Sequence, residues 1–273
     1  MGGRGSKSGI TSGAGAGGGG GAFQIQQTPP NRAATPQQAQ QLNNSVFSDT
    51  DTADFHDLFG GRQYFQKQNL DIDAQVAIVD YLDPNTERGS LYNMSQNMNH
   101  AISTGQKLTA QQRYVYDSMV DASHNLGYNL NLTRYDHGDM IDDLLRQKGI
   151  TGGHDGMSIS ALKKALVGHA YADARILSTS VNNFRDASPA SRDTFTTREV
   201  KITYHAKASA QALMPGDGPG GRLGEMCLAP TGTRGHNTYR IVDVKYSGNK
   251  ARKKGYSTAS LNTRQIELIV EVD

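Results

Sequence analysis

Three groups of polar residues stand at the ends of predicted strands and have side chains suited to binding and catalysis. Arg134 follows the alternating stretch "YNLNLT", the hydroxyl cluster Ser178, Thr179 and Ser180 follows "RIL", and Glu225 precedes "MCLAP". A guanidinium presents a planar fork of donors to phosphate oxygens, hydroxyls orient neighbouring groups, and a carboxylate stabilises positive charge that develops during a reaction. Strand ends around a cleft are a normal place for a site, so these residues are the first candidates.

Each of these residues also has a simpler interpretation. Arg134 can pair with Asp136 or Asp139 at the surface, as most single arginines do. The Ser178 hydroxyl can satisfy backbone groups where a strand ends, and Glu225 can be a solvated charge at a strand edge. The sequence leaves these alternatives open.

The elements before Arg134 are predicted to be mostly helical. In "LDIDAQVAIVDYL", Ile72, Val76 and Val79 fall on one helical face, and Leu91, Met94 and Met98 form a second apolar stripe. A third helix is predicted in "TAQQRYVYDSMVDASHNL", with Thr109 as its N-cap and Tyr116, Met119 and Val120 facing inward.

The remainder of the chain combines two more helices with a series of strands. In "YNLNLTRYDH", Leu130 and Leu132 lie on one face and Asn131 and Thr133 on the other, as in a strand. Helices are predicted in "HGDMIDDLLRQKG", which Gly149 ends, and in "SISALKKALVGHAYA". Strands then follow in "RILSTS", "TTREVKITYHAKAS", "GEMCLAP", "NTYRIVDVKYSG" and "TRQIELIVEV". Helices followed by strands indicate an α+β fold.

Composition divides the chain into two parts. Residues 1–45 are rich in Gly and Ser and then in Gln, Asn and Pro, with few apolar side chains, which predicts a disordered arm. Residues 46–273 are predicted to form one folded domain. The arm is expected to act as a tether or to become ordered on a larger assembly.

Bulk properties and motifs exclude several classes of protein. With 28 Lys and Arg against 26 Asp and Glu, nothing indicates bulk binding to nucleic acid or to a membrane. The single cysteine, Cys227, cannot form an internal disulfide, and no apolar run approaches the length of a spanning helix. No secretory signal is recognisable, so a reducing, soluble compartment is expected. The histidines His137, His154, His169 and His205 show no metal-ligand spacing, and no phosphate-binding loop is present.

Taken together, "LTRY", "ILSTS" and "GEMCLAPTGT" resemble the Arg–Ser–Glu group of the ADP-ribosyltransferase superfamily, which includes clostridial toxins and phage-borne enzymes. The order is that of the family, and the separations are similar: Ser178 follows Arg134 by 178 − 134 = 44 residues, and Glu225 follows Ser178 by 225 − 178 = 47. The stretch "VDYLDPNTERGSLYNMSQNMNHAIS" also resembles a helical region of the family, so that the resemblance covers about residues 70–273.

The resemblance implies N-terminal helices followed by two packed, mainly antiparallel sheets that form a cleft for NAD. It implies that Arg134 anchors the pyrophosphate, that Ser178 orients the catalytic carboxylate with support from Thr179 and Ser180, and that Glu225 stabilises the reacting ribose. Phe184 or Phe195 is a candidate for stacking on nicotinamide, and burial in the core is the alternative for both. NAD serves as substrate and no metal is needed.

Two features of the sequence complicate the assignment. Many members of the family carry Glu or Gln two residues before the catalytic Glu, where this chain has Leu223. Leu223 and Arg222, in the flexible loop "LMPGDGPGGRLG", are the candidates for recognising the acceptor. A second Gln-x-Glu pattern, Gln265 and Glu267, lies 267 − 178 = 89 residues after Ser178, about twice the other separation.

The resemblance implies a mono-ADP-ribosyltransferase that transfers ADP-ribose from NAD to a protein acceptor in a host cell. The expected location is the host cytoplasm, with packaging in a virion beside phage head proteins as an alternative suggested by the N-terminal arm. Nucleic acid and membranes are not expected partners. Two rival functions stay open: NAD glycohydrolysis without an acceptor, and a non-catalytic, virion-associated structural or binding protein that retains the fold.

Overall fold

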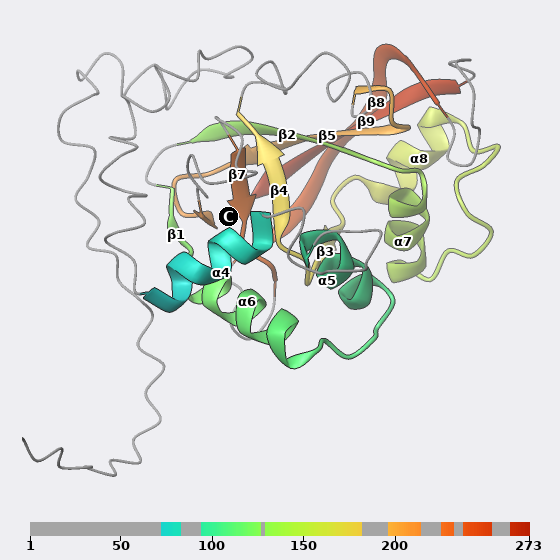
Figure 1. Ribbon diagram of the computed structural model, residues 1–273. Coiled ribbons are helices and arrows are strands. Elements are labelled where there is room, and N and C mark those ends of the chain that lie inside the picture. Colours follow the sequence, from blue (N-terminus) through green and yellow to red (C-terminus); the bar gives the residue numbers. More distant parts are fainter. Residues whose placement is uncertain are drawn as a thin grey trace, which may run out of the picture.

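The structure, a computed structural model, describes residues 72–82, 94–126, 129–181, 196–213, 225–231, 237–252 and 263–273 (Figure 1). The predicted arm and the proposed domain boundary at residue 46 lie outside these residues. The helices in the described part are α4 (Ile72–Leu82), α5 (Met94–Ser103), α6 (Ala110–Asp121), α7 (Asp139–Gln147) and α8 (Ile159–Leu166).

The described strands all belong to one sheet. They are β1 (His124–Asn125), β2 (Leu130–Asp136), β3 (Ala170–Tyr171), β4 (Leu177–Ser180), β5 (Val200–Ala206), β6 (Gln211–Leu213), β7 (Glu225–Leu228), β8 (Tyr239–Ala251) and β9 (Thr263–Val272). Their order across the sheet is β1-β6-β7-β4-β2-β5-β9-β8-β3. Only β5 and β9 run parallel, so the expectation of a mainly antiparallel α+β fold is confirmed.

The expected division into two sheets is not observed, because β4 bonds to strands on both of its sides. It pairs with β7 over four residues, and it pairs with β2 through a single position, Thr133 opposite Ser180. The sheet therefore consists of two halves, β1-β6-β7-β4 and β2-β5-β9-β8-β3, joined at one residue pair.

Two apolar cores hold the helices against the sheet. Helices α7 and α8 contribute to the larger core, with Leu132 of β2, Ile202 of β5 and Val270 of β9 among its buried members. Helices α4, α5 and α6 form the second core with residues in or next to the other half of the sheet, Ile176, Leu213 and Cys227. Figure 1 shows this second group of helices gathered below β4 and β7.

Helix α6 begins as the sequence predicts. The Thr109 side chain accepts a hydrogen bond from the backbone N–H of Gln112, and the Gln112 side chain accepts one from the backbone N–H of Thr109. This capping box satisfies two donors that the first turn of a helix would otherwise leave unpaired. Met119 and Val120 are buried as expected, together with Val115.

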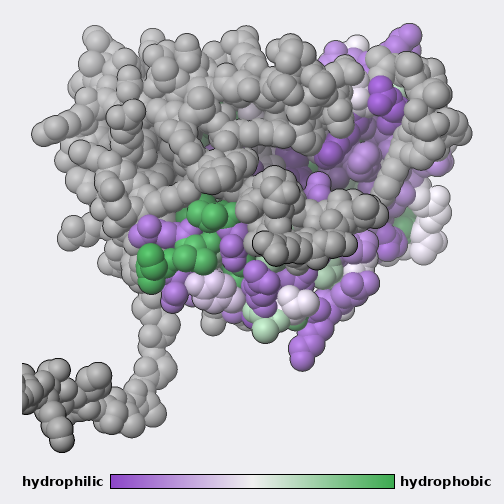
Figure 2. All heavy atoms as spheres, viewed as in Figure 1, coloured by the Kyte–Doolittle hydropathy of each residue, from purple (hydrophilic) through white to green (hydrophobic). Residues whose placement is uncertain are grey.

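The prediction of which face of helix α4 points into the core is wrong. Ile72 and Val76 are exposed, at 70% and 44%, whereas Ala74, Ala77, Ile78 and Tyr81 are buried. Helix α4 therefore packs through two alanines, an isoleucine and a tyrosine, and not through the face that the sequence pattern favoured. Figure 2 shows apolar side chains at the surface over this helix. No helix of the described part is long and apolar enough to cross a membrane.

Candidate active site

The pairing of β4 with β7 brings Ser178 and Glu225 onto one face of the sheet. Ser180 lies opposite Glu225, and Ser178 lies opposite Cys227. Because side chains alternate along a strand and directly opposed residues share a face, Ser178 and Glu225 occupy diagonal positions on the same side. Ser178 and Glu225 are both half-buried, so this face remains accessible at these two positions.

Arg134 reaches the same strand from β2. Its Nη1 donates to the Ser178 backbone oxygen at 3.0 Å, and its Nε pairs with Asp136 Oδ2 at 3.3 Å. The side chains of Arg134 and Asp136 are only 17% and 13% exposed, so this is not a surface ion pair. Arg134 and Ser178 therefore lie in direct contact although 44 residues separate them.

Asp136 connects Arg134 to a second arginine. Arg175 Nη1 lies 3.8 Å from Asp136 Oδ2, and Arg175 also makes a bidentate pair with Asp173, at 2.9 and 2.7 Å. Burial alone would raise the pKa of Asp136, but Arg134 and Arg175 outweigh it and hold that pKa below its ordinary value. Asp136 is therefore a carboxylate that holds two guanidiniums close together.

A third arginine lies close to this group. Arg198 Nη1 donates to the Tyr135 backbone oxygen at 3.0 Å. The pKa of Arg198 is lowered by burial and by the charge of Arg134, against the effect of Asp136. Three guanidiniums and two carboxylates, Asp136 and Asp173, leave a formal charge of +1. An excess of buried positive charge favours the binding of an anion such as a phosphate.

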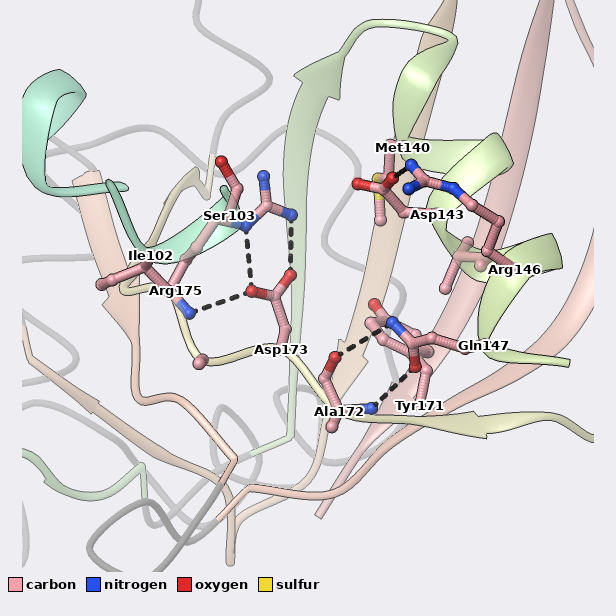
Figure 3. Close-up of a pocket in the computed structure, with 12 residues that line it drawn as sticks. Ile102, Ser103, Met140, Asp143, Arg146, Gln147, Tyr171, Ala172, Asp173 and Arg175 are labelled. Atoms are coloured by element: carbon pink, nitrogen blue, oxygen red, sulfur yellow. Dashed lines mark hydrogen bonds and ion pairs between the residues drawn. The ribbon is translucent and has the colours of Figure 1, made fainter. Parts of the chain in front are cut away.

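A hollow of about 510 Å³ opens beside Arg175 and Asp173, a size in the range of small-molecule sites (Figure 3). Figure 3 shows the Arg175–Asp173 pair on one side and helix α7 on the other. The hollow is lined by Ile102, Ser103, Met140, Asp143, Leu144, Arg146, Gln147, Tyr171, Ala172, Asp173, Ala174 and Arg175. It has both apolar surface and charged groups, and it adjoins the arginine cluster.

Helix α4 supplies a contact to Ser178 from the helical layer. The Tyr81 hydroxyl lies 3.1 Å from Ser178 Oγ, and Cys227 Sγ lies 3.8 Å from the same oxygen. Burial raises the pKa of Tyr81 and of Cys227, and the negative charge of Glu225 raises both further. Glu225 is thus close enough to Tyr81 and Cys227 for its charge to affect their ionisation.

The other two members of the hydroxyl cluster differ from Ser178. Thr179 is 1% exposed, and its Oγ1 donates to the Met226 backbone oxygen at 2.7 Å, so it supports the pairing of β4 with β7. Ser180 is 5% exposed. These positions fit the expected support of strand geometry, but burial does not favour direct contact of either hydroxyl with a cofactor.

Several predicted site residues lie outside the described part of the chain. These are the stacking candidates Phe184 and Phe195 and the acceptor candidates Arg222 and Leu223, and their roles stay predictions. Among the described residues, no group of three or more His, Cys, Asp or Glu side chains is arranged to hold a metal ion.

The alternative pair Gln265 and Glu267 lies elsewhere in the sheet, on β9, which β2 and β5 separate from β4. Gln265 is fully buried and bonds the backbone oxygens of Thr196 and Arg198, each at 2.8 Å. Glu267 accepts hydrogen bonds from Lys201 at 2.8 Å and from Thr203 at 2.9 Å. Glu267 links β9 to β5, and Gln265 holds the segment that precedes β5, so both side chains have structural partners, which weakens the alternative.

The sequence analysis missed four residues of this neighbourhood: Tyr81, Asp173, Arg175 and Arg198. Arg175 stands three positions before Ser178 in "ARILSTS", and this closeness is the signal that was available for it. Tyr81 precedes Ser178 by 97 residues, and no local pattern connects the two.

Comparison with solved structures identifies proteins with the same fold. The C3 exoenzyme of Clostridium limosum superposes with a TM-score of 0.55 at 16% identity, covering 84% of this chain and 98% of the exoenzyme. Plx2a, an ADP-ribosyltransferase toxin from Paenibacillus larvae, gives a TM-score of 0.55 at 16% identity, with 84% and 100% covered.

A third similar structure is the ADP-ribosylating toxin BECa, part of a binary enterotoxin of C. perfringens, determined with NADH. Its TM-score is 0.50 at 14% identity, with 76% of this chain and 44% of BECa covered. No protein-family model and no curated protein matches the chain. The similarity of this chain to these proteins is therefore a similarity of fold.

Proposed function

We propose that this chain, which has the fold of C3-like ADP-ribosyltransferase toxins, binds NAD and transfers its ADP-ribose to a protein acceptor with release of nicotinamide. The observation that carries the proposal is the contact of Arg134 with the strand that presents Ser178, next to the strand that begins with Glu225. BECa, which shares the fold, was determined with NADH, and this supports a dinucleotide as the ligand.

Each residue has a role that its position supports. Arg134, with Arg175 and Arg198 nearby, supplies positive charge for the pyrophosphate, and Asp136 keeps two of these guanidiniums in place. Ser178 orients the carboxylate of Glu225, which stabilises positive charge on the ribose as the bond to nicotinamide breaks. Nicotinamide leaves with the bonding electron pair, and the acceptor forms a new bond to the ribose and loses a proton to solvent.

Leu223 favours a second candidate, NAD glycohydrolysis. Because the family usually places Glu or Gln at that position to engage an acceptor, a leucine there leaves cleavage of NAD intact and weakens transfer to a side chain. In this case water takes the place of the acceptor.

The test uses purified full-length protein, labelled NAD and a bacterial lysate, with Glu225→Gln and Glu271→Gln compared with the wild type. Glu271 is a matched control because it is a carboxylate on β9, paired with Lys207 at 2.9 Å. We expect labelled acceptor bands and nicotinamide release from the wild type and from Glu271→Gln. Glu225→Gln should lose at least about 100-fold in rate, as removal of one charge-stabilising group commonly does.

The outcomes separate the candidates. Nicotinamide release without labelled bands favours glycohydrolysis. Absence of both, together with absence of NAD binding in calorimetry, supports the non-catalytic alternative and overturns the proposal.

A further inference from the structure

Tyr81 is the group from the helical layer whose hydroxyl bonds the candidate catalytic serine. It lies in α4, is 2% exposed, and places its hydroxyl 3.1 Å from Ser178 Oγ. Its ring belongs to the core between the helices and the sheet, together with Ile176, Leu213 and Cys227. Phenylalanine would fill the same volume, so the hydroxyl adds a specific polar contact to an otherwise apolar position.

The contact has a definite chemical consequence. A buried phenol whose pKa is raised stays neutral at physiological pH and has one proton to donate. If that proton is donated to Ser178 Oγ, the serine proton is free to point elsewhere. The other neighbour of this oxygen, Cys227 Sγ at 3.8 Å, is a weak acceptor, and burial keeps it protonated.

A charged acceptor for the serine proton lies on the same face of the sheet, the carboxylate of Glu225. Cys227 lies directly opposite Ser178, and Glu225 lies two residues before Cys227 on the same strand and therefore on the same face. Diagonal neighbours across an antiparallel pair are within reach of a long side chain such as glutamate.

We propose that Tyr81 is a positioning residue of the transfer reaction: its hydroxyl donates to Ser178 Oγ, so that the Ser178 hydroxyl donates to the Glu225 carboxylate and holds it at the ribose. This inference rests on the proposed function. It gives helix α4 a role in catalysis besides covering the sheet. The proposed relay of hydrogen bonds runs from Tyr81 in α4 through Ser178 in β4 to Glu225 in β7.

The experiment measures nicotinamide release from NAD by the full chain. Tyr81→Phe removes the hydroxyl and keeps the ring. Tyr114→Phe is the control, because the Tyr114 hydroxyl also bonds α4, donating to the Asp73 backbone oxygen at 3.2 Å, but at an exposed position away from Ser178. We expect Tyr81→Phe to lower kcat about tenfold or more with KM for NAD changed less than twofold, because a misplaced catalytic group affects the transition state. Tyr114→Phe should retain the wild-type kcat.

A double-mutant cycle with Ser178→Ala tests whether Tyr81 acts through the serine. Adding Tyr81→Phe to Ser178→Ala should cause no further loss, because the relay is already broken. Equal kcat for the two tyrosine variants, or additive losses in the cycle, overturns the relay while the proposed function stands. A wild-type protein that neither binds nor cleaves NAD overturns both, and thermal unfolding of each variant shows that the fold is kept.

Discussion

The guanidinium of Arg134 has two structural tasks besides the role proposed for it. It donates to the Ser178 backbone oxygen and to Asp136, which fixes both the strand β4 and the orientation of the guanidinium itself. Burial alone would lower the pKa of Arg134, but Asp136 outweighs it and raises that pKa, so the group is always charged. A charged fork of donors held from two sides loses little conformational freedom on binding an anion, which is the property that the proposed role of Arg134 requires.

Replacing Arg134 with lysine keeps the charge and removes the fork. The ammonium group cannot bond Ser178, Asp136 and a phosphate in the same planar geometry, so we expect NAD affinity to fall at least about tenfold. Isothermal calorimetry measures the change. Arg113→Lys is the control, since Arg113 makes an exposed pair with Asp117 at 3.9 Å, and it should bind NAD like the wild type. Unchanged affinity in Arg134→Lys would remove Arg134 from the proposed binding site.

At the scale of elements, the helical layer depends on how α6 begins and on how α4 packs against it. The capping box at Thr109 fixes the start of α6, and Tyr114 of α6 bonds the backbone of Asp73 in α4. Helix α4 in turn carries Tyr81 to the sheet. The stability of the cap therefore bears on the position of a side chain next to the candidate site.

Thr109→Ala should lower the free energy of unfolding by about 1 kcal/mol, because the backbone N–H of Gln112 loses the Thr109 hydroxyl as its acceptor, while the reciprocal bond from the residue 109 backbone N–H stays possible. Urea denaturation followed by circular dichroism checks this. Ser158→Ala provides the comparison, since Ser158 caps α8 with one bond, to the backbone N–H of Ala161, and should cost no more than Thr109→Ala. An unchanged midpoint for Thr109→Ala would show that packing alone holds the helix.

The types of the elements were easier to predict than their partners. The alternation around Leu130 and Leu132 and the run "TRQIELIVEV" specify strands locally, and β9 spans Thr263–Val272 as predicted. The short strands β1, β3 and β6 have two or three residues and no pattern long enough to detect. The inner face of α4 was wrong because alanines carry little weight in a hydrophobic pattern, although Ala74 and Ala77 allow close packing.

In the candidate site, too, residues in local motifs could be predicted, and a contact that depends on packing could not. Arg134, Ser178 and Glu225 were found because each stands at a strand end in a motif of the resembling family. Tyr81 was missed because its contact depends on how a helix docks on the sheet, which no spacing in the sequence encodes. Asp136 was expected as a surface partner of Arg134, and only the structure shows that the pair is largely buried and shared with Arg175.

At the scale of the whole molecule, a buried histidine at the sheet edge makes stability depend on pH. His124 in β1 is 8% exposed, and burial lowers its pKa to about 4, against the opposing effect of a hydrogen bond with the Ala122 backbone. In the unfolded chain the histidine takes up a proton near pH 6.5, whereas in the folded protein it does so only near pH 4. The stability that neutral His124 contributes is therefore fully present above pH 6.5 and is lost as the pH drops from 6.5 toward 4.

We expect the free energy of unfolding to decrease by on the order of 3 kcal/mol across this range on account of His124. Urea denaturation at pH 6.5 and at pH 4.5 measures the slope. His124→Gln should have a flatter slope, and His100→Gln, at an exposed position of α5, should keep the wild-type slope. Equal slopes for His124→Gln and the wild type would contradict the assignment.

The narrow junction between the two halves of the sheet has a mechanical consequence. In the part of the chain that the structure describes, Thr133 and Ser180 are the one opposed pair between β2 and β4, and the bond from Arg134 to the Ser178 backbone oxygen is a second link, so few bonds connect the half of the sheet with Arg134 to the half with Glu225. Under the proposed function, an NAD molecule that contacts Arg134 at its pyrophosphate and Glu225 at its ribose would span both halves of the sheet and add a further connection between them. Bound substrate would thus help to keep Arg134 and Glu225 at the separation that the proposed reaction requires.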